Sequence, residues 1–148
     1  MPVNFRALRN SRSGMVLVAA AGPAMNIGLA IVAALSFHLI VYLPAIATQW
    51  VVLNLKNAIV INVILAVFNL FPLPPLDGGR IAVGLLPKVF AIQLARLERY
   101  GMIILVGIII VLPLLGSQFG VDLGFVSHFI SSATDTVIKA ILRLTGNV

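Results

Sequence analysis

The chain has 148 residues, of which 61% are hydrophobic and only 9% are charged, so it cannot cover a water-exposed surface with polar side chains and is not an ordinary soluble domain. Its ten basic residues outnumber the four acidic ones, but they are scattered through apolar sequence and not clustered with aromatic residues, which argues against a nucleic-acid partner. Because the sequence contains no cysteine, disulfides and thiolate ligands are excluded, and any metal must be held by His, Asp or Glu.

The first predicted element is a membrane-spanning helix. Residues 1–14 are polar and carry three arginines, and an apolar run then extends over residues 15–43. Some 20 residues at about 1.5 Å each cross a hydrocarbon core of about 30 Å, so this run is long enough to span. The basic start resembles a signal peptide, but the apolar run resumes from Ile27 and is too long for one. Pro44 and Trp50 are expected at the far interface of this helix.

A second apolar segment, residues 51–71, is unusual because four asparagines share one face of the helix that it predicts: Asn54, Asn57, Asn62 and Asn69. An unpaired amide in hydrocarbon is costly, so we expect this face to lie against protein or a water-filled cavity. The first helix offers a stripe that permits close approach, made of Gly22, Asn26, Ala30 and Ala33. In an alternative interpretation, the amides only join the two helices by hydrogen bonds.

Residues 71–80, with the sequence FPLPPLDGGR, interrupt the helical pattern. Three prolines remove backbone donors and clash with preceding carbonyls, so the chain is predicted to be extended before Asp77. Two glycines and the apolar residues 81–86 follow, which places the Asp77 carboxylate at the N-terminus of a helix. The residues alone leave three roles open for Asp77: a metal ligand, part of an ion or proton relay, and a plain helix cap.

The rest of the chain predicts one more span and a C-terminal helix. Residues 87–99 carry several charges and are predicted to lie at the surface or shallow in the membrane. Residues 101–115 form a third apolar run, which covers only about 22 Å as a helix and needs flanking residues to span. Residues 116–128 are predicted as a loop. From Val126 on, apolar positions repeat opposite a polar face, which predicts an amphipathic helix at the interface or one side of an oligomer contact.

Together these segments predict an all-α membrane protein with about three transmembrane helices, a Pro-rich extended loop before Asp77 and a C-terminal amphipathic helix. We divide it into a membrane domain, residues 1–115, and an outer loop with the last helix, residues 116–148. Lys and Arg number three before the first span and four in residues 72–100. By the positive-inside rule, the N-terminus and the Asp77 loop face the cytoplasm, in a cell membrane of bacterial type.

Among the four acidic residues, only Asp77 is predicted to lie where membrane chemistry could use it. Glu98 stands beside arginines and is most simply their surface partner. Asp122 falls in the outer loop, and Asp135 falls on the polar face of the last helix. Both histidines are assigned to the outer side, so they are not expected to be co-ligands of Asp77.

Two sequence elements resemble those of a known family. Residues 69–80, NLFPLPPLDGGR, closely resemble the N-x-x-P-x-P-x-L-D-G signature of the site-2 protease family of intramembrane metallopeptidases. Residues 21–26, AGPAMN, resemble the G-P-x-x-N element on that family's preceding helix. The order and separation of the two elements fit, as does the LERYG sequence at 97–101 that opens the next apolar run. The resemblance covers roughly residues 2–115.

The resemblance implies a membrane-embedded zinc metalloendopeptidase that acts in regulated intramembrane proteolysis. In the family, two histidines of an H-E-x-x-H motif and the Asp of L-D-G hold Zn²⁺, and the glutamate activates the zinc-bound water. That water attacks a peptide bond in or near a transmembrane segment of a membrane-protein substrate. The resemblance implies Asp77 as the third zinc ligand, the amides Asn26 and Asn69 near the site, and a substrate-side loop made of Pro72, Pro74 and Pro75.

The H-E-x-x-H motif is missing from this sequence. It is expected before Gly22, where the 21 residues given contain no histidine. We therefore expect the chain to be the C-terminal portion of such a protease, shortened by a late start assignment or a true truncation, and inactive alone. Two other classes stay open: a small transporter or channel subunit, and a non-catalytic scaffold that binds membrane helices. Besides the substrate, the expected partners are the lipid bilayer and a second copy of the chain in a homo-oligomer.

Overall fold

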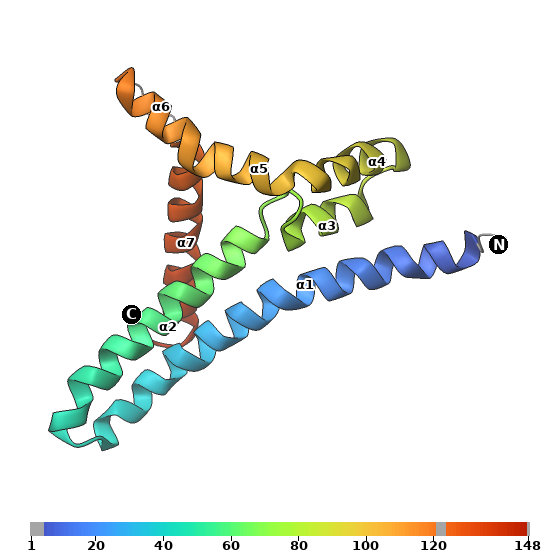
Figure 1. Ribbon diagram of the computed structural model, residues 1–148. Coiled ribbons are helices and arrows are strands. Elements are labelled where there is room, and N and C mark those ends of the chain that lie inside the picture. Colours follow the sequence, from blue (N-terminus) through green and yellow to red (C-terminus); the bar gives the residue numbers. More distant parts are fainter. Residues whose placement is uncertain (1–4, 121–123, 148) are drawn as a thin grey trace.

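The computed structural model describes the backbone of residues 5–120 and 124–147, with side chains from Arg12 onward, and every regular element in this part is a helix (Figure 1). The helices follow one another in the order α1 (Phe5–Ser36), η1 (Phe37–Tyr42), α2 (Ala45–Asn69), α3 (Asp77–Leu85), α4 (Lys88–Leu97), η2 (Glu98–Tyr100), α5 (Gly101–Val106), η3 (Gly107–Val111), α6 (Leu112–Gln118) and α7 (Phe125–Leu144). The predicted all-α class is confirmed.

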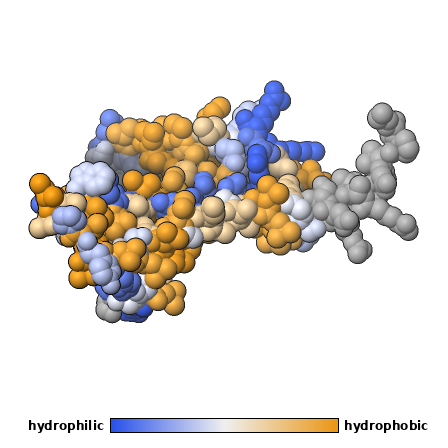
Figure 2. All heavy atoms as spheres, turned by 90° about the horizontal axis from the view of Figure 1, so that it is seen from below, coloured by the Kyte–Doolittle hydropathy of each residue, from blue (hydrophilic) through white to orange (hydrophobic). Residues whose placement is uncertain are grey.

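Among the residues that the structure describes, three helical stretches are long and apolar enough to cross a membrane: Arg12–Tyr42, Ala45–Asn69 and Lys88–Gln118. Apolar side chains dominate much of the face seen in Figure 2, and many large hydrophobic residues are exposed. This is the surface expected of helices that meet lipid. The apolar run over residues 101–115 was expected to need flanking residues in order to span. In the structure α4 and η2 continue directly into this run and supply the additional length.

The third stretch contains a π-helical turn, η3, just before Pro113. Pro113 has no N–H, so it cannot donate the usual hydrogen bond to the carbonyl four residues earlier, that of Ile109. A π turn pairs each carbonyl with the residue five positions later, which removes the need for that donor. The proline therefore accounts for the wider turn without breaking the helix.

α1 and α2 form an antiparallel hairpin that builds the core. Ala30, Ala33 and Ala34 of α1 are buried in one cluster with three larger aliphatic side chains, Ile59, Val63 and Ile141. Alanines let the backbones of two helices approach closely, so the buried face of α2 can reach α1. One detail differs from expectation: α2 begins directly after Pro44, so Trp50 lies within it and not between two helices.

α7 packs on α2, with Ile141 in the core. The end of the chain is tied to the first helix, because His38 Nε2 donates to the Thr145 carbonyl at 2.7 Å and Asn147 Nδ2 donates to the Ala34 carbonyl at 2.9 Å. The predicted helix is confirmed, and part of its apolar face, with Val137 and Ile141, packs against this same chain, whereas Phe129 and Leu144 are exposed. The predicted loop over 116–128 is wrong at both ends, since α6 continues to Gln118 and α7 begins at Phe125; Asp122 lies outside the described residues.

The proline loop between α2 and α3 is non-helical, as predicted, and it is packed by glycines. Pro74 is fully buried. A Cβ atom on Gly79 would strike the Pro74 backbone nitrogen, and one on Gly101 would strike the Pro74 carbonyl. A Cβ atom on Gly78 would likewise strike the Leu70 carbonyl. The loop can therefore lie this close to α3 and α5 only because these positions lack a side chain.

The packing predicts a specific effect of Gly101→Ala. The added methyl group would collide with the Pro74 backbone, and overpacking of this kind costs about 1–3 kcal/mol. We expect thermal unfolding in detergent, followed by circular dichroism, at a clearly lower temperature than for the unsubstituted chain. Gly28→Ala is the matched control, because nothing lies within 4 Å of its Cβ position and alanine favours a helix by about 1 kcal/mol over glycine. Equal destabilisation by both variants would contradict the packing.

Candidate functional site

Asp77 is the first residue of α3, at the junction with the proline loop. The N-cap position is occupied by Leu76, which has no capping side chain. Within residues 12–120 and 124–147, the Asp77 carboxylate has no hydrogen bond, so the plain helix-cap interpretation is wrong. The side chain is half-buried in the first turn, where the helix dipole favours a negative charge. The fold therefore holds a carboxylate that it does not use for its own hydrogen bonding.

The carboxylate lies against Gly22 of α1. A Cβ atom built on Gly22 would be only 2.9 Å from Oδ2 of Asp77, so any larger residue would push the carboxylate aside. Asn26 follows Gly22 by four residues, which places it one helical turn along the same face, and its side chain is half-buried. The family resemblance implied that the G-P-x-x-N element lies near Asp77. In the structure Gly22 of this element lies directly against the Asp77 carboxylate.

Asn69 approaches the same region from α2, where it is the last residue. The start of α3 lies against the end of α2, because the Cβ position of Gly78 meets the Leu70 carbonyl. Three elements therefore converge: the glycine of α1, the C-terminus of α2 with the half-buried Asn69, and the N-terminus of α3 with Asp77. This end of the hairpin gathers the sequence-predicted polar residues of the site.

The three loop prolines differ in accessibility. Pro72 is exposed, Pro75 is half-buried and Pro74 is fully buried. Pro74 therefore has a packing role, and Pro72 is the proline with most surface available to a bound peptide. Beside the loop, a cavity of about 340 Å³ lies between α1, α3 and α4, with Pro74, Arg80 and Glu98 among its lining residues.

The rim of this cavity carries an ion pair, in which Arg80 Nη2 donates to Glu98 Oε1 at 3.4 Å. The sequence had predicted neighbouring arginines as the partners of Glu98, and this was wrong. Arg80 lies three residues after Asp77, on the next turn of α3, and folding brings it to η2. Both side chains are about half exposed, so the pair contributes at most about 1 kcal/mol.

The asparagine face of α2 does not behave as expected. Asn54 Nδ2 donates to the Trp50 carbonyl and Asn62 Nδ2 donates to the Ala58 carbonyl, both at 2.8 Å. These amides bond their own helix, so they do not join α1 and α2. Asn54 is also exposed, and the face of α2 that is buried carries Ile59 and Val63 instead. Intrahelical hydrogen bonds reduce the cost of such amides in lipid.

No three His, Cys, Asp or Glu side chains are grouped so that they could hold a metal ion, as far as the described part of the chain goes. His38 is engaged with the Thr145 carbonyl at the far end of α1. His128 lies in α7, outside the region where the three elements converge. Asp77 is thus a single candidate ligand among the described residues at this site.

The sequence comparisons place this geometry in a family. A family model described as peptidase family M50 matches residues 39–114, which run from η1 to α6 and include the proline loop and Asp77. The chain belongs to peptidase family M50. This is the site-2 protease family, so the resemblance of the sequence motifs is confirmed. The match begins after Gly22 and Asn26, and the structure brings Gly22 against Asp77, with Asn26 one turn farther along α1.

One relative is a protein of Bacillus subtilis (strain 168) that bears the name "Putative zinc metalloprotease YwhC". It is 35% identical over 121 residues, which cover 77% of this chain and 53% of the relative. The chain therefore spans about half the length of the relative that it matches. No solved structure matches the chain.

Sequence reasoning missed how the site is supported. The contacts of Gly22 with Asp77 and of Gly101 with Pro74 join segments far apart in the chain. The signal available in the sequence was the position of these glycines, inside the G-P-x-x-N element and directly after LERY. Glycine at a helix position where alanine would be more stable indicates close approach of another group.

The contact between α1 and α3 can be tested by a disulfide in this cysteine-free chain. In the double variant Gly22→Cys with Asp77→Cys, the Cβ position of residue 22 lies 3.9 Å from the position of Asp77 Cγ, where the new sulfur atom of residue 77 would stand. A small movement of the side chains then brings the two sulfur atoms to bonding distance. We expect oxidation to link residues 22 and 77, detected as a cross-linked peptide by mass spectrometry. The pair Gly28→Cys with Asp77→Cys serves as control, since nothing lies near the Gly28 Cβ position. Equal cross-linking of both pairs would refute the contact.

Proposed function

We propose that this M50 chain forms part of a membrane-embedded zinc metalloendopeptidase of site-2 protease type, which hydrolyses peptide bonds in or near transmembrane segments of its substrates. The observation that carries the proposal is the Asp77 carboxylate, held against Gly22 at the start of α3 and left without a hydrogen bond by the described residues. Family membership favours a protease over the transporter and scaffold interpretations.

Asp77 fits one position of a zinc site but not a whole site. A catalytic zinc has three protein ligands and one open position, and the carboxylate oxygen is an accepted ligand. The described residues offer no second His, Asp or Glu beside it. The proposal therefore gives the other ligands and the general base to a segment that carries H-E-x-x-H. Zinc would supply a bound water with its pKa lowered to about 7.

The residues of this chain would position the carboxylate and the substrate. Gly22 leaves room for the Asp77 side chain, and the packed Pro74 fixes the loop from which α3 starts. Pro72 is exposed on this loop, whose non-helical backbone can lie alongside an extended peptide segment. The half-buried amides of Asn26 and Asn69 can each donate to and accept from a peptide group.

The membrane placement follows from the three long apolar stretches, which we propose cross the bilayer. The basic residues near the N-terminus and in residues 72–100 support an orientation with Asp77 toward the cytoplasmic side, which we propose for a bacterial-type membrane. The substrate would be a membrane protein whose transmembrane segment enters from the bilayer. Hydrolysis within the membrane needs polar groups on the membrane helices, and Asp77, Asn26 and Asn69 provide them.

The proposal predicts that zinc binding depends on Asp77. We expect the chain, extended at its N-terminus by a membrane segment with H-E-x-x-H, to copurify with about one zinc per chain. Asp77→Asn should lower the zinc affinity at least tenfold, since even the groups that orient zinc ligands contribute about 10–100-fold. Elemental analysis measures the metal, and a membrane protein with one transmembrane segment reports cleavage.

Asp135→Asn is the matched control, because Asp135 is an exposed carboxylate on α7 and is not expected to affect zinc. Retention of zinc and cleavage by the Asp77→Asn variant would overturn the assignment. Capture of membrane helices without zinc or cleavage, unaffected by Asp77→Ala, would instead favour the scaffold.

A further inference from the structure

Lys56 is a cation within the second candidate span and plays no part in the proposed catalytic site. It lies six residues after Trp50, which corresponds to about 9 Å along the helix. Its ammonium group forms no ion pair with any side chain that the structure describes, and the side chain is exposed. An ionisable group in a membrane helix costs free energy and usually marks a functional site. We therefore searched the surroundings of Lys56 for a group that could bind its counter-ion.

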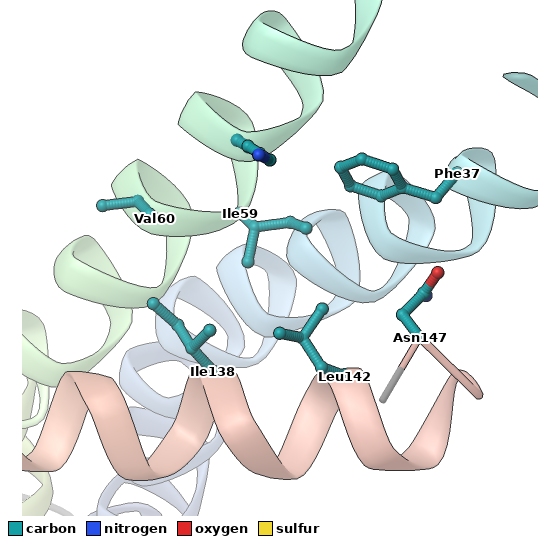
Figure 3. A pocket seen from close by; sticks show the side chains of 7 residues that line it. Phe37, Ile59, Val60, Ile138, Leu142 and Asn147 are labelled. Atoms are coloured by element: carbon teal, nitrogen blue, oxygen red, sulfur yellow. The ribbon is translucent and has the colours of Figure 1, made fainter.

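Lys56 borders a groove between α2 and α7. One cavity, of about 350 Å³, is lined by Lys56 together with apolar side chains such as Phe37 and Ile59. Figure 3 shows Phe37 and Ile59 on one side of this cavity and Ile138 and Leu142 of α7 on the other. A second cavity, of about 430 Å³, shares two lining residues with the first, Val60 and Ile138. The two cavities therefore adjoin each other along the α2–α7 contact, and we refer to them together as the groove.

The Lys56 end of the groove also holds a hydrogen-bond acceptor. Asn147 Nδ2 donates to the Ala34 carbonyl and to Thr145 Oγ1, both at 2.9 Å, so both amide hydrogens are used. The oxygen Oδ1 remains available, and Figure 3 shows it extending from the end of α7 toward Phe37. This end thus combines a positive charge with an acceptor.

Farther along, the groove contains a buried donor without a partner. Thr134 is only 5% exposed, and its Oγ1 has no hydrogen bond to any residue in the described ranges. It lines the second cavity together with Ser131 and Ser127, one and two turns earlier on α7. Buried hydroxyl groups are almost always paired, so an acceptor from a bound molecule would satisfy this one.

Asp135 is a carboxylate at this groove, and it forms no ion pair with Lys56. It is exposed, and Lys139 follows one turn later on α7, at a spacing where opposite charges attract. Val60, Ile64 and Phe68 of α2 form the opposite wall of the second cavity. The groove therefore presents, in order, a cation with an acceptor, a buried hydroxyl donor and an apolar wall.

We propose that this groove binds one anionic phospholipid with a hydroxylated headgroup, of the phosphatidylglycerol class. The phosphate pairs with Lys56, and a headgroup hydroxyl donates to Asn147 Oδ1. An ester carbonyl accepts from Thr134 Oγ1, and an acyl chain lies along Val60, Ile64 and Phe68. A phospholipid carries these groups in the same order as the groove, whereas a protein helix would need an acidic side chain within its membrane segment.

The test measures which lipid the 148-residue chain retains. The protein is reconstituted in nanodiscs of equal amounts of dioleoyl phosphatidylglycerol and dioleoyl phosphatidylcholine, repurified in mild detergent, and its lipid is quantified by mass spectrometry. We expect phosphatidylglycerol to be enriched about fivefold, the factor that corresponds to about 1 kcal/mol for one basic residue at an anionic lipid. Lys56→Gln should remove this preference, and Lys56→Arg should keep it.

Lys88→Gln is the matched control, since Lys88 is an exposed cation at the start of α4, outside the groove. Thr134→Val should reduce retention of both lipids by a similar factor of about five, because both carry the ester carbonyl, and Thr134→Ser should restore it. The proposal is overturned by lipid recovered in the input ratio, by unchanged preference in the Lys56→Gln variant, or by a protein helix cross-linked to residue 56 in place of lipid.

Discussion

The packing of Pro74 between two glycines is the contact on which the functional end of the molecule depends. Gly79 of α3 and Gly101 of α5 each face its backbone with no room for a methyl group. One buried proline therefore fixes where the third helix starts and where the last long apolar stretch begins. Because α3 opens with Asp77, the position of the carboxylate is set by backbone packing and needs no hydrogen bond of its own.

The sequence predicted those parts of the structure that follow from local patterns. The helices arise from apolar runs, the loop from its prolines, and the position of Asp77 from the helix that starts after them. Partners across the fold were not predictable in the same way: Glu98 bonds Arg80 and not its neighbours, and α7 packs inward on α2. Such pairings depend on which helix faces pack together. The hydrophobic period of a sequence shows which face of a helix is buried, but not which other helix covers that face.

The two proposals place different chemistry at different positions along α2. Asn69, at its C-terminus, belongs to the convergence around Asp77, while Lys56 lies 13 residues earlier, about 20 Å along the axis. Near the turn between α1 and α2, hydrogen bonds from His38 to Thr145 and from Asn147 to Ala34 hold the C-terminal segment against the first helix. A lipid held against α2 and α7 would stabilise the same contact from the membrane side, independently of the metal.

The π turn over Gly107–Val111 also changes how the last apolar stretch presents its surface. A turn with an extra residue shifts the helical phase, so side chains after Val111 point in a direction that a continuous wheel of residues 101–118 does not give. The stretch can thus keep Gly101 on the proline loop while η3 contacts α7. The π turn before Pro113 therefore rotates the side chains of α6 relative to those of α5 within one continuous helical stretch.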